Sequence, residues 1–165
     1  MLNKMPPNKK EKLIMTEALA RRGNAILLGR RKKNGFGQGK WLGLGGKLET
    51  NESIEDAMVR ECSEEANIKV KKFAKRGVLT FYYADDPNME VHYFEILDYS
   101  GEPTDSEEME VKWTTLDKIP YKNMFPNDRY WLPMFLEKKY FEGEFYFDKS
   151  YKIVRYKINH IKASA

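Results

Sequence analysis

The chain has 165 residues, and its 29 lysines and arginines against 25 aspartates and glutamates give a formal net charge of +4. This length predicts one domain with a substantial core, and the charge is lower than the basic stripe of most nucleic-acid-binding domains. The single cysteine excludes an internal disulfide and indicates a reducing, cytoplasmic location. No apolar run is long enough for a membrane span, and no secretory signal is visible.

The predicted elements form one α+β domain over residues 13–160, between a mobile basic tail at 1–12 and a short tail at 161–165. Alternating apolar residues and turn signals predict strands at residues 13–19, 25–28, 70–83, 89–97, a short stretch ending near 113, 141–147 and 153–158. One helix is expected after Ser53, and a second within residues 121–140, capped by Asn127 or Asp128. The expected fold is a mixed sheet sandwiched between helices.

Four consecutive cations at residues 30–33 precede a segment, 35–46, that holds six glycines. The cations form either a solvated hairpin tip or a clamp that faces phosphate, and both interpretations stay open. The density of glycine indicates a backbone that approaches a ligand closely or adopts positive φ. Phe36 and Trp41, within this segment, either contact a planar base or pack in the core.

The helix after Ser53 carries acids where its core-facing side should continue. At ~100° per residue, Glu61 and Glu65 lie on the apolar stripe and Glu64 lies at its edge. These acids repel one another, oppose the helix dipole and lose hydration when they face a core. Arg60 is one cation against three acids, whereas Mg²⁺ binds carboxylate oxygens and keeps positions for water and phosphate. A solvated acidic face is the alternative, and the glycine-rich segment just upstream favours the metal site.

Residues 46–68 resemble the signature of the Nudix hydrolase family. Gly46 is followed after five residues by Glu52, and after seven more by Arg60-Glu61-Cys62-x-Glu64-Glu65-x-Asn67-Ile68. The family pattern is G-x5-E-x7-R-E-U-x-E-E-x-G-U, where U is apolar. Cys62 takes the first apolar position, and a buried cysteine behaves as a small hydrophobe. Asn67 replaces the last glycine, and asparagine is the next-best residue for a left-handed helix cap.

The resemblance extends, over residues 13–158, to the branch of MutT homologues that hydrolyse oxidised purine nucleoside triphosphates. It rests on residues 26–29, 35–41, 45–47, 105–109, 124–128 and 130–131. It implies a Nudix fold and hydrolysis of a substrate such as 8-oxo-dGTP to the monophosphate and pyrophosphate, with Mg²⁺ or Mn²⁺ as cofactor. Such an enzyme sanitises the nucleotide pool and so avoids DNA damage. We expect a monomer with a small nucleotide substrate and no stable nucleic-acid or membrane partner.

The same resemblance implies three sets of site residues. The catalytic residues would be Glu52, Arg60, Glu61, Glu64, Glu65 and Glu108. The metal would be held by Glu61, Glu64, Glu65, Glu108 and the carbonyl of Gly45. Either Glu61 or Glu108 would take the proton of the attacking water, while Arg60 anchors the glutamates and Glu52 braces the loop before the helix. The substrate would be bound by Thr16, Lys32, Phe36, Leu42, Gly45, Gly46, Lys47, Phe81, Met109, Phe125, Asn127, Asp128 and Trp131.

The substrate-binding set departs from the branch at three positions. The relatives have asparagine at Leu42, tryptophan at Phe125 and aspartate at Asn127. Leu42 offers no hydrogen bond to a base, so base discrimination should change more than the chemistry. Three alternatives stay open. They are a Nudix enzyme for ADP-ribose, dinucleoside polyphosphates or capped RNA, a silent Nudix ligand sensor, and a nucleic-acid-binding module that uses residues 30–33.

Overall fold

The computed structural model describes residues 11–161, so the predicted tail up to residue 10 and residues 162–165 lie outside the described part. Within that part, the strands are β1 Lys12–Arg22, β2 Ala25–Arg31, β3 Trp41–Leu42, β4 Lys69–Tyr82, β5 Asn88–Ser100, β6 Met109–Thr115, β7 Tyr140–Phe147 and β8 Ile153–Ile161. The α-helices are α1 Ile54–Ala66 and α2 Asp128–Leu136. The predicted α+β fold is therefore confirmed, with element ends shifted by a few residues.

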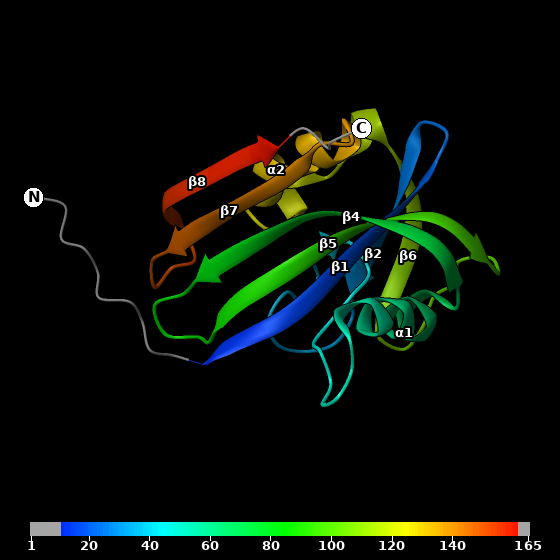
Figure 1. The fold of residues 1–165 in the computed structure, drawn as a ribbon, viewed down its shortest axis with the longest axis horizontal. Coiled ribbons are helices and arrows are strands. Elements are labelled where there is room, and N and C mark those ends of the chain that lie inside the picture. The colour runs from blue at the N-terminus through cyan, green and yellow to red at the C-terminus, as the bar shows by residue number, and fades with distance from the viewer. Residues whose placement is uncertain (1–10, 162–165) are drawn as a thin grey trace, which may run out of the picture.

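The strands form one mixed sheet in the order β3-β2-β1-β5-β4-β7-β8, and β6 pairs with β2 (Figure 1). β1 runs parallel to β5, and β4 runs parallel to β7. β1 and β2 share registered pairs only beside their turn. Further along β1, the glycine-rich segment takes the place of β2, through bridges between Ala18 and Leu44 and between Met15 and Lys47. This segment is therefore held directly against β1.

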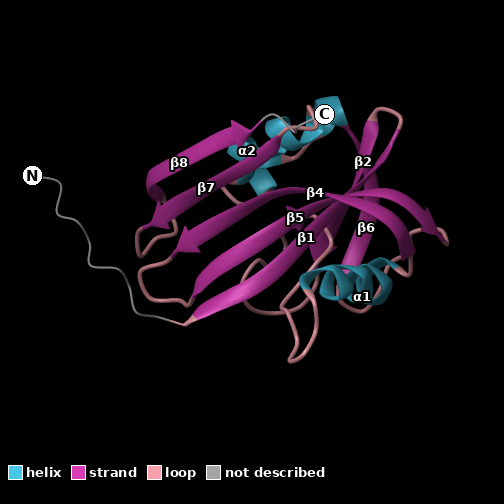
Figure 2. Ribbon diagram, in the orientation of Figure 1, coloured by secondary structure: helices cyan, strands magenta, loops and turns pink. Residues whose placement is uncertain are grey.

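The two helices cover opposite faces of the sheet. Ala18 and Leu27 belong to the core cluster that contains residues of α1, whereas Leu19 and Leu28 belong to the cluster that contains residues of α2. This division follows from the period of two along a strand. Figure 2 shows the helices packed against the strands at well-separated places. None of the described helices is long and apolar enough to span a membrane.

Helix α1 begins and ends as its sequence predicts. The Ser53 hydroxyl accepts a hydrogen bond from the Asp56 N–H at 3.0 Å. Asn67 ends the helix in the left-handed conformation, with φ 58°, and donates its N–H to the Ser63 carbonyl. Cys62 is fully buried. The cap predicted for Asn67 and the apolar role predicted for Cys62 are both confirmed.

Helix α2 departs from the prediction at its first turn. Asn127 stands at the N-cap position, but its side chain makes no capping hydrogen bond. The backbone there is helical, with φ −77° and ψ −18°, and the Asn127 Nδ2 donates to Asp128 Oδ1 at 3.1 Å instead. Asp128 Oδ2 accepts from the Phe125 N–H at 3.1 Å, which stabilises the turn before the helix. The predicted side-chain cap by either residue is therefore wrong, because the Asp128 carboxyl group folds back on the preceding turn.

Substitution of the α1 cap tests its conformation. Asn67→Ala should lower the free energy of unfolding by about 1 kcal/mol, because a β-carbon is disfavoured at positive φ. Asn67→Gly removes the side-chain hydrogen bonds to Thr104 and Asp105 but not the left-handed backbone, and it should lie between Asn67→Ala and the wild type. Urea unfolding of the variants measures both changes. Equal stability of Asn67→Ala and the wild type would contradict the left-handed cap.

Candidate active site

Three carboxyl groups meet beside the last turns of α1. One oxygen from each of Glu61, Glu65 and Glu108 lies within 4.8 Å of the others. Glu61 and Glu65 project from α1, and Glu108 comes from the segment just before β6. Glu65 is only 2% exposed, and burial raises its pKa to about 8 although the Gly45 N–H donates to its Oε1 at 2.6 Å. The cluster therefore concentrates negative charge where little water screens it.

Arg60 links the other acids of the signature. It pairs with both oxygens of Glu52, through Nε at 2.7 Å and Nη2 at 3.0 Å, and holds the pKa of Glu52 below its ordinary value. Its Nη1 also lies 3.0 Å from Glu61 and 3.2 Å from Glu64. Burial nevertheless raises the pKa of Glu61, and the charges of Glu64 and Glu108 raise it further. Arg60 is shared among too many acids to neutralise the cluster.

The donor atoms of the cluster fit a hard divalent cation. Carboxylate oxygens are the ligands that Mg²⁺ and Mn²⁺ prefer, and like charges this close together are stabilised by a cation between them. Glu64, predicted as a further ligand, is half exposed and lies outside the group of three. Lys33 already pairs with Glu108, with 2.6 Å between Nζ and Oε1. The described residues thus contain a carboxylate cluster able to hold a metal ion.

Two glycines separate this cluster from a pocket on the α2 side of the sheet. A β-carbon on Gly45 would lie 1.9 Å from the Thr16 carbonyl oxygen, and one on Gly46 would lie 2.6 Å from Glu61 Oε1. At Gly45 only glycine fits beside the backbone of β1, and at Gly46 a larger residue would displace the Glu61 carboxyl group. Both glycines also line the pocket, so the pocket and the carboxylates share a wall.

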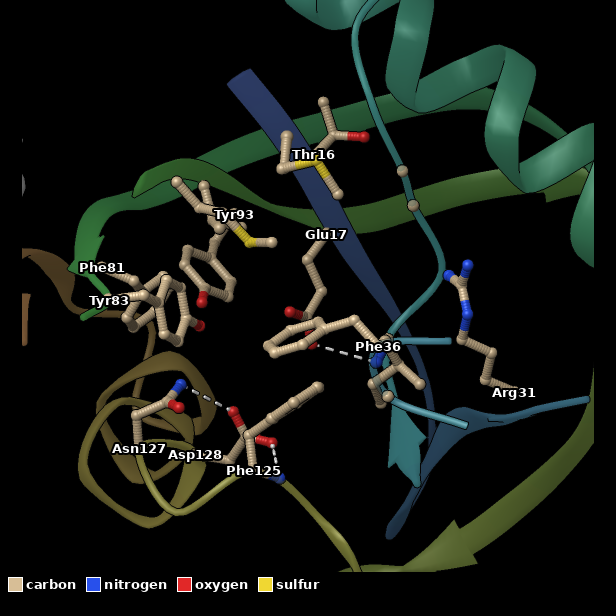
Figure 3. Close-up of a pocket in the computed structure, with 18 residues that line it drawn as sticks. Thr16, Glu17, Arg31, Phe36, Phe81, Tyr83, Tyr93, Phe125, Asn127 and Asp128 are labelled. Carbon is tan, nitrogen blue, oxygen red and sulfur yellow. Dashed lines mark hydrogen bonds between the residues drawn. The ribbon is translucent and has the colours of Figure 1, made fainter. Parts of the chain in front are cut away.

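The pocket is enclosed by β1, β5, the end of β4, the glycine-rich segment and the start of α2 (Figure 3). Its walls are mostly apolar, and they include Met15, Leu42, Phe81, Met89, Val91 and Phe125. Phe36 is 41% exposed and stacks on Phe125, with 5.2 Å between ring centroids. Polar groups come from Glu17, Tyr83, Tyr93, Asn127 and Asp128. Such a cavity suits a planar ligand with a polar edge.

Most of the residues predicted to bind substrate line this pocket. They are Thr16, Phe36, Leu42, Gly45, Gly46, Phe81, Phe125, Asn127 and Asp128. Four others do not. Trp131 is buried behind Asp128 and donates its Nε1–H to Asp128 Oδ1 at 2.9 Å. Met109 packs in the cluster on the α1 side, Lys47 pairs with β1, and Lys32 donates to the Ser106 carbonyl at 2.9 Å.

The basic residues 30–33 do not all play the same part: some form surface ion pairs, as expected for a solvated hairpin tip, and one faces the pocket, as expected for a phosphate clamp. Arg30 pairs with Glu110, and Lys33 pairs with Glu108. Arg31 lines the pocket, and its charge lowers the pKa of Glu65, so it faces both sites. The cation at the pocket is thus Arg31, whereas the sequence analysis expected Lys32. The aromatic residues divide as well, since Phe36 lines the pocket and Trp41 packs against the core on the α2 side.

Glu17 is a pocket residue that the sequence analysis missed. It lies on β1 between Met15 and Leu19, whose apolar side chains face α2. Its Oε1 accepts a hydrogen bond from the Gly43 N–H at 3.0 Å, and burial raises its pKa to about 7. An acid at an inward position of an otherwise apolar strand was the signal available in the sequence.

Residues 16–135 match the NUDIX domain, and the chain belongs to the Nudix family. Among known proteins, the chain is 40% identical to an oxidized purine nucleoside triphosphate hydrolase of Mus musculus and to one of Danio rerio. Each match covers 90% of this chain, and 95% and 96% of those proteins. The solved structure of a MutT protein from Bacillus halodurans superposes with a TM-score of 0.78, over 89% of this chain and 97% of that one. At 22% identity, that likeness supports the fold alone.

The buried Glu17 carboxyl group predicts a pH-dependent stability. Its pKa is about 7 in the folded state against an ordinary 4.5, so the folded state holds the proton more tightly. The resulting stabilisation is complete below the lower value and is lost as pH rises through the higher one. Glu17→Gln removes this loss of stability. It also removes the charge that raises the pKa of Asp128, and this second change likewise makes the variant more stable than the wild type at high pH.

The variant should therefore gain about 1–3 kcal/mol in free energy of unfolding, relative to the wild type, between about pH 5 and about pH 8. Urea unfolding at the two pH values measures the gain. Glu102→Gln, at an exposed glutamate, is the control and should show no such change. A constant difference between Glu17→Gln and the wild type would contradict the raised pKa.

Proposed function

We propose that this chain hydrolyses oxidised or otherwise modified purine nucleoside triphosphates, such as 8-oxo-dGTP, to the monophosphate and pyrophosphate. The main support is the wall that the apolar pocket and the carboxylate cluster share at Gly45 and Gly46. A purine in the pocket would direct its phosphates past these glycines towards the acids. The identity to hydrolases named for oxidized purine nucleoside triphosphates supports the same substrate class. The reaction would sanitise the nucleotide pool.

The proposed cofactor is Mg²⁺ or Mn²⁺, held by Glu61, Glu65 and Glu108. Glu64 and the Gly45 carbonyl would complete the ligand set. The close approach of the three carboxyl oxygens and the raised pKa values of Glu61 and Glu65 support this assignment. When bound, such an ion neutralises charge on phosphate oxygens and lowers the pKa of a bound water.

The protein would supply the base, the anchor and a phosphate contact. Glu61 or Glu108 would accept the proton of the attacking water. Burial raises the pKa of Glu61, which makes its carboxylate a stronger base. Arg60 would hold Glu61 in position while Glu52 fixes Arg60 from the other side. Arg31, between the pocket and Glu65, would contact the polyphosphate.

The purine would pack against the apolar walls, with Asn127 and Asp128 at its polar edge. Leu42 lines the same pocket, and its side chain offers no hydrogen bond to the base. We also propose a reducing compartment such as the cytoplasm. The single cysteine, Cys62, is buried and unpaired, which is consistent with it.

The role of the carboxylate cluster can be tested at Glu65. Glu65→Gln should lower kcat for 8-oxo-dGTP by at least about 100-fold, because it removes a ligand charge from the cluster. Pyrophosphate release in the presence of magnesium measures the rate, and chelation with EDTA should abolish it. Glu55→Gln, at an exposed residue in the first turn of α1, is the matched control. A folded Glu65→Gln enzyme with the native rate would contradict the proposed role of the carboxylate cluster in hydrolysis.

The substrate class is tested by competition between 8-oxo-dGTP, 2-hydroxy-dATP, O6-methyl-dGTP and the unmodified nucleotides. Leu42→Asn restores a hydrogen-bonding side chain and should shift the relative kcat/KM values by about 10-fold in favour of 8-oxo-dGTP. Unchanged ratios would show that Leu42 does not contact the base. A wild-type preference for ADP-ribose, a dinucleoside polyphosphate or capped RNA would replace this substrate class with another.

A further inference from the structure

Two carboxyl groups, that of the buried Asp128 and that of the partly buried Glu17, reach the pocket from different elements (Figure 3). Glu17 projects from the middle of β1, and Asp128 is the first residue of α2. Burial raises both pKa values, and the charge of Glu17 raises that of Asp128 further. The two groups therefore face one enclosed space.

Both carboxyl oxygens of Asp128 accept hydrogen bonds from neighbouring groups of the protein. Its Oδ1 accepts from Trp131 Nε1 at 2.9 Å and from Asn127 Nδ2 at 3.1 Å, and its Oδ2 accepts from the Phe125 N–H at 3.1 Å. These three donors fix the carboxyl group at the start of α2. Asp128 is thus held as part of the pocket wall.

The two carboxyl oxygens of Glu17 differ in their hydrogen bonds. Its Oε1 accepts the Gly43 N–H, and its Oε2 has no hydrogen-bond partner among residues 11–161. Support of the Gly43 backbone needs only one acceptor oxygen. The second oxygen is open to the pocket, where a ligand can donate a hydrogen bond to it. Leu42, the neighbour of Gly43, provides no polar group there.

We propose that Glu17 is a specificity-determining residue, whose Oε2 accepts a hydrogen bond from an N–H of the bound purine. This inference rests on the proposed function. The favoured ligands are purines of the guanine type, which carry two adjacent donors, N1–H and the 2-amino group, on one edge. Base discrimination then comes from β1, on the face of the sheet opposite the carboxylate cluster.

Glu17→Gln is the decisive variant, because it keeps the side-chain length and an oxygen for the Gly43 N–H. It replaces the second oxygen by an NH₂ group, which opposes another N–H donor. The values of kcat and KM are measured for dGTP, for dITP, which lacks the 2-amino group, and for O6-methyl-dGTP, which lacks N1–H. Loss of kcat/KM should reach about 10- to 100-fold for nucleotides that carry the contacted N–H, and it should be far smaller for the analogue without it.

The loss should appear mainly in KM, because a base contact is made in the ground state and the transition state alike. Sparing of dITP would identify the 2-amino group as the donor, and sparing of O6-methyl-dGTP would identify N1–H. Glu17→Leu, which removes both oxygens, should give the same order of losses. Glu102→Gln is the control for a distant acid, and unfolding curves exclude a general loss of structure.

An equal loss for all three nucleotides, or no loss, would overturn the role of Glu17 and leave the proposed function in place. A wild-type protein that hydrolyses no purine nucleoside triphosphate in the presence of magnesium would overturn both. The two failures are therefore distinguishable.

Discussion

The burial of carboxyl groups on the core-facing side of α1 is the constraint on which the rest of the site depends. Glu65 is almost inaccessible to water, and burial raises the pKa of both Glu61 and Glu65. A fold tolerates such groups only with partners close by. The Gly45 N–H supplies one, and Arg60 supplies another. The glycine-rich segment and α1 are therefore joined at Glu65.

Strand β1 lies between the carboxylate cluster and the pocket. Because successive side chains of a strand point to opposite faces, Ala18 and Ala20 lie on the α1 side while Met15 and Glu17 lie on the α2 side. The α1 side carries the Nudix signature, in which every carboxylate is present. The α2 side carries the pocket, which Leu42 lines. Substitutions on the pocket side can therefore change the pocket without disturbing the carboxylate cluster.

Not every residue of the predicted site lines the pocket, and the reasons are physical. Trp131 lies behind the pocket wall, where it packs on Tyr93 with 4.3 Å between ring centroids and donates a hydrogen bond to Asp128. Lys32 was expected near the substrate, but Arg31 lines the pocket, because the direction of strand β2 decides which of the two adjacent side chains turns towards it. Glu17 escaped notice because an acid within an apolar strand reads as an exposed position until the opposite wall is known.

The sequence by itself determined the features that depend on neighbouring residues. The caps of α1 at Ser53 and Asn67, its stripe of acids and the alternation of the strands all arise within one helix or one strand. Only the tertiary structure decided that Glu108 joins the acids of α1, and that Glu17 and Asp128, from opposite ends of the chain, share one pocket. Those contacts depend on strand order and on which face each helix covers, and no local spacing encodes either.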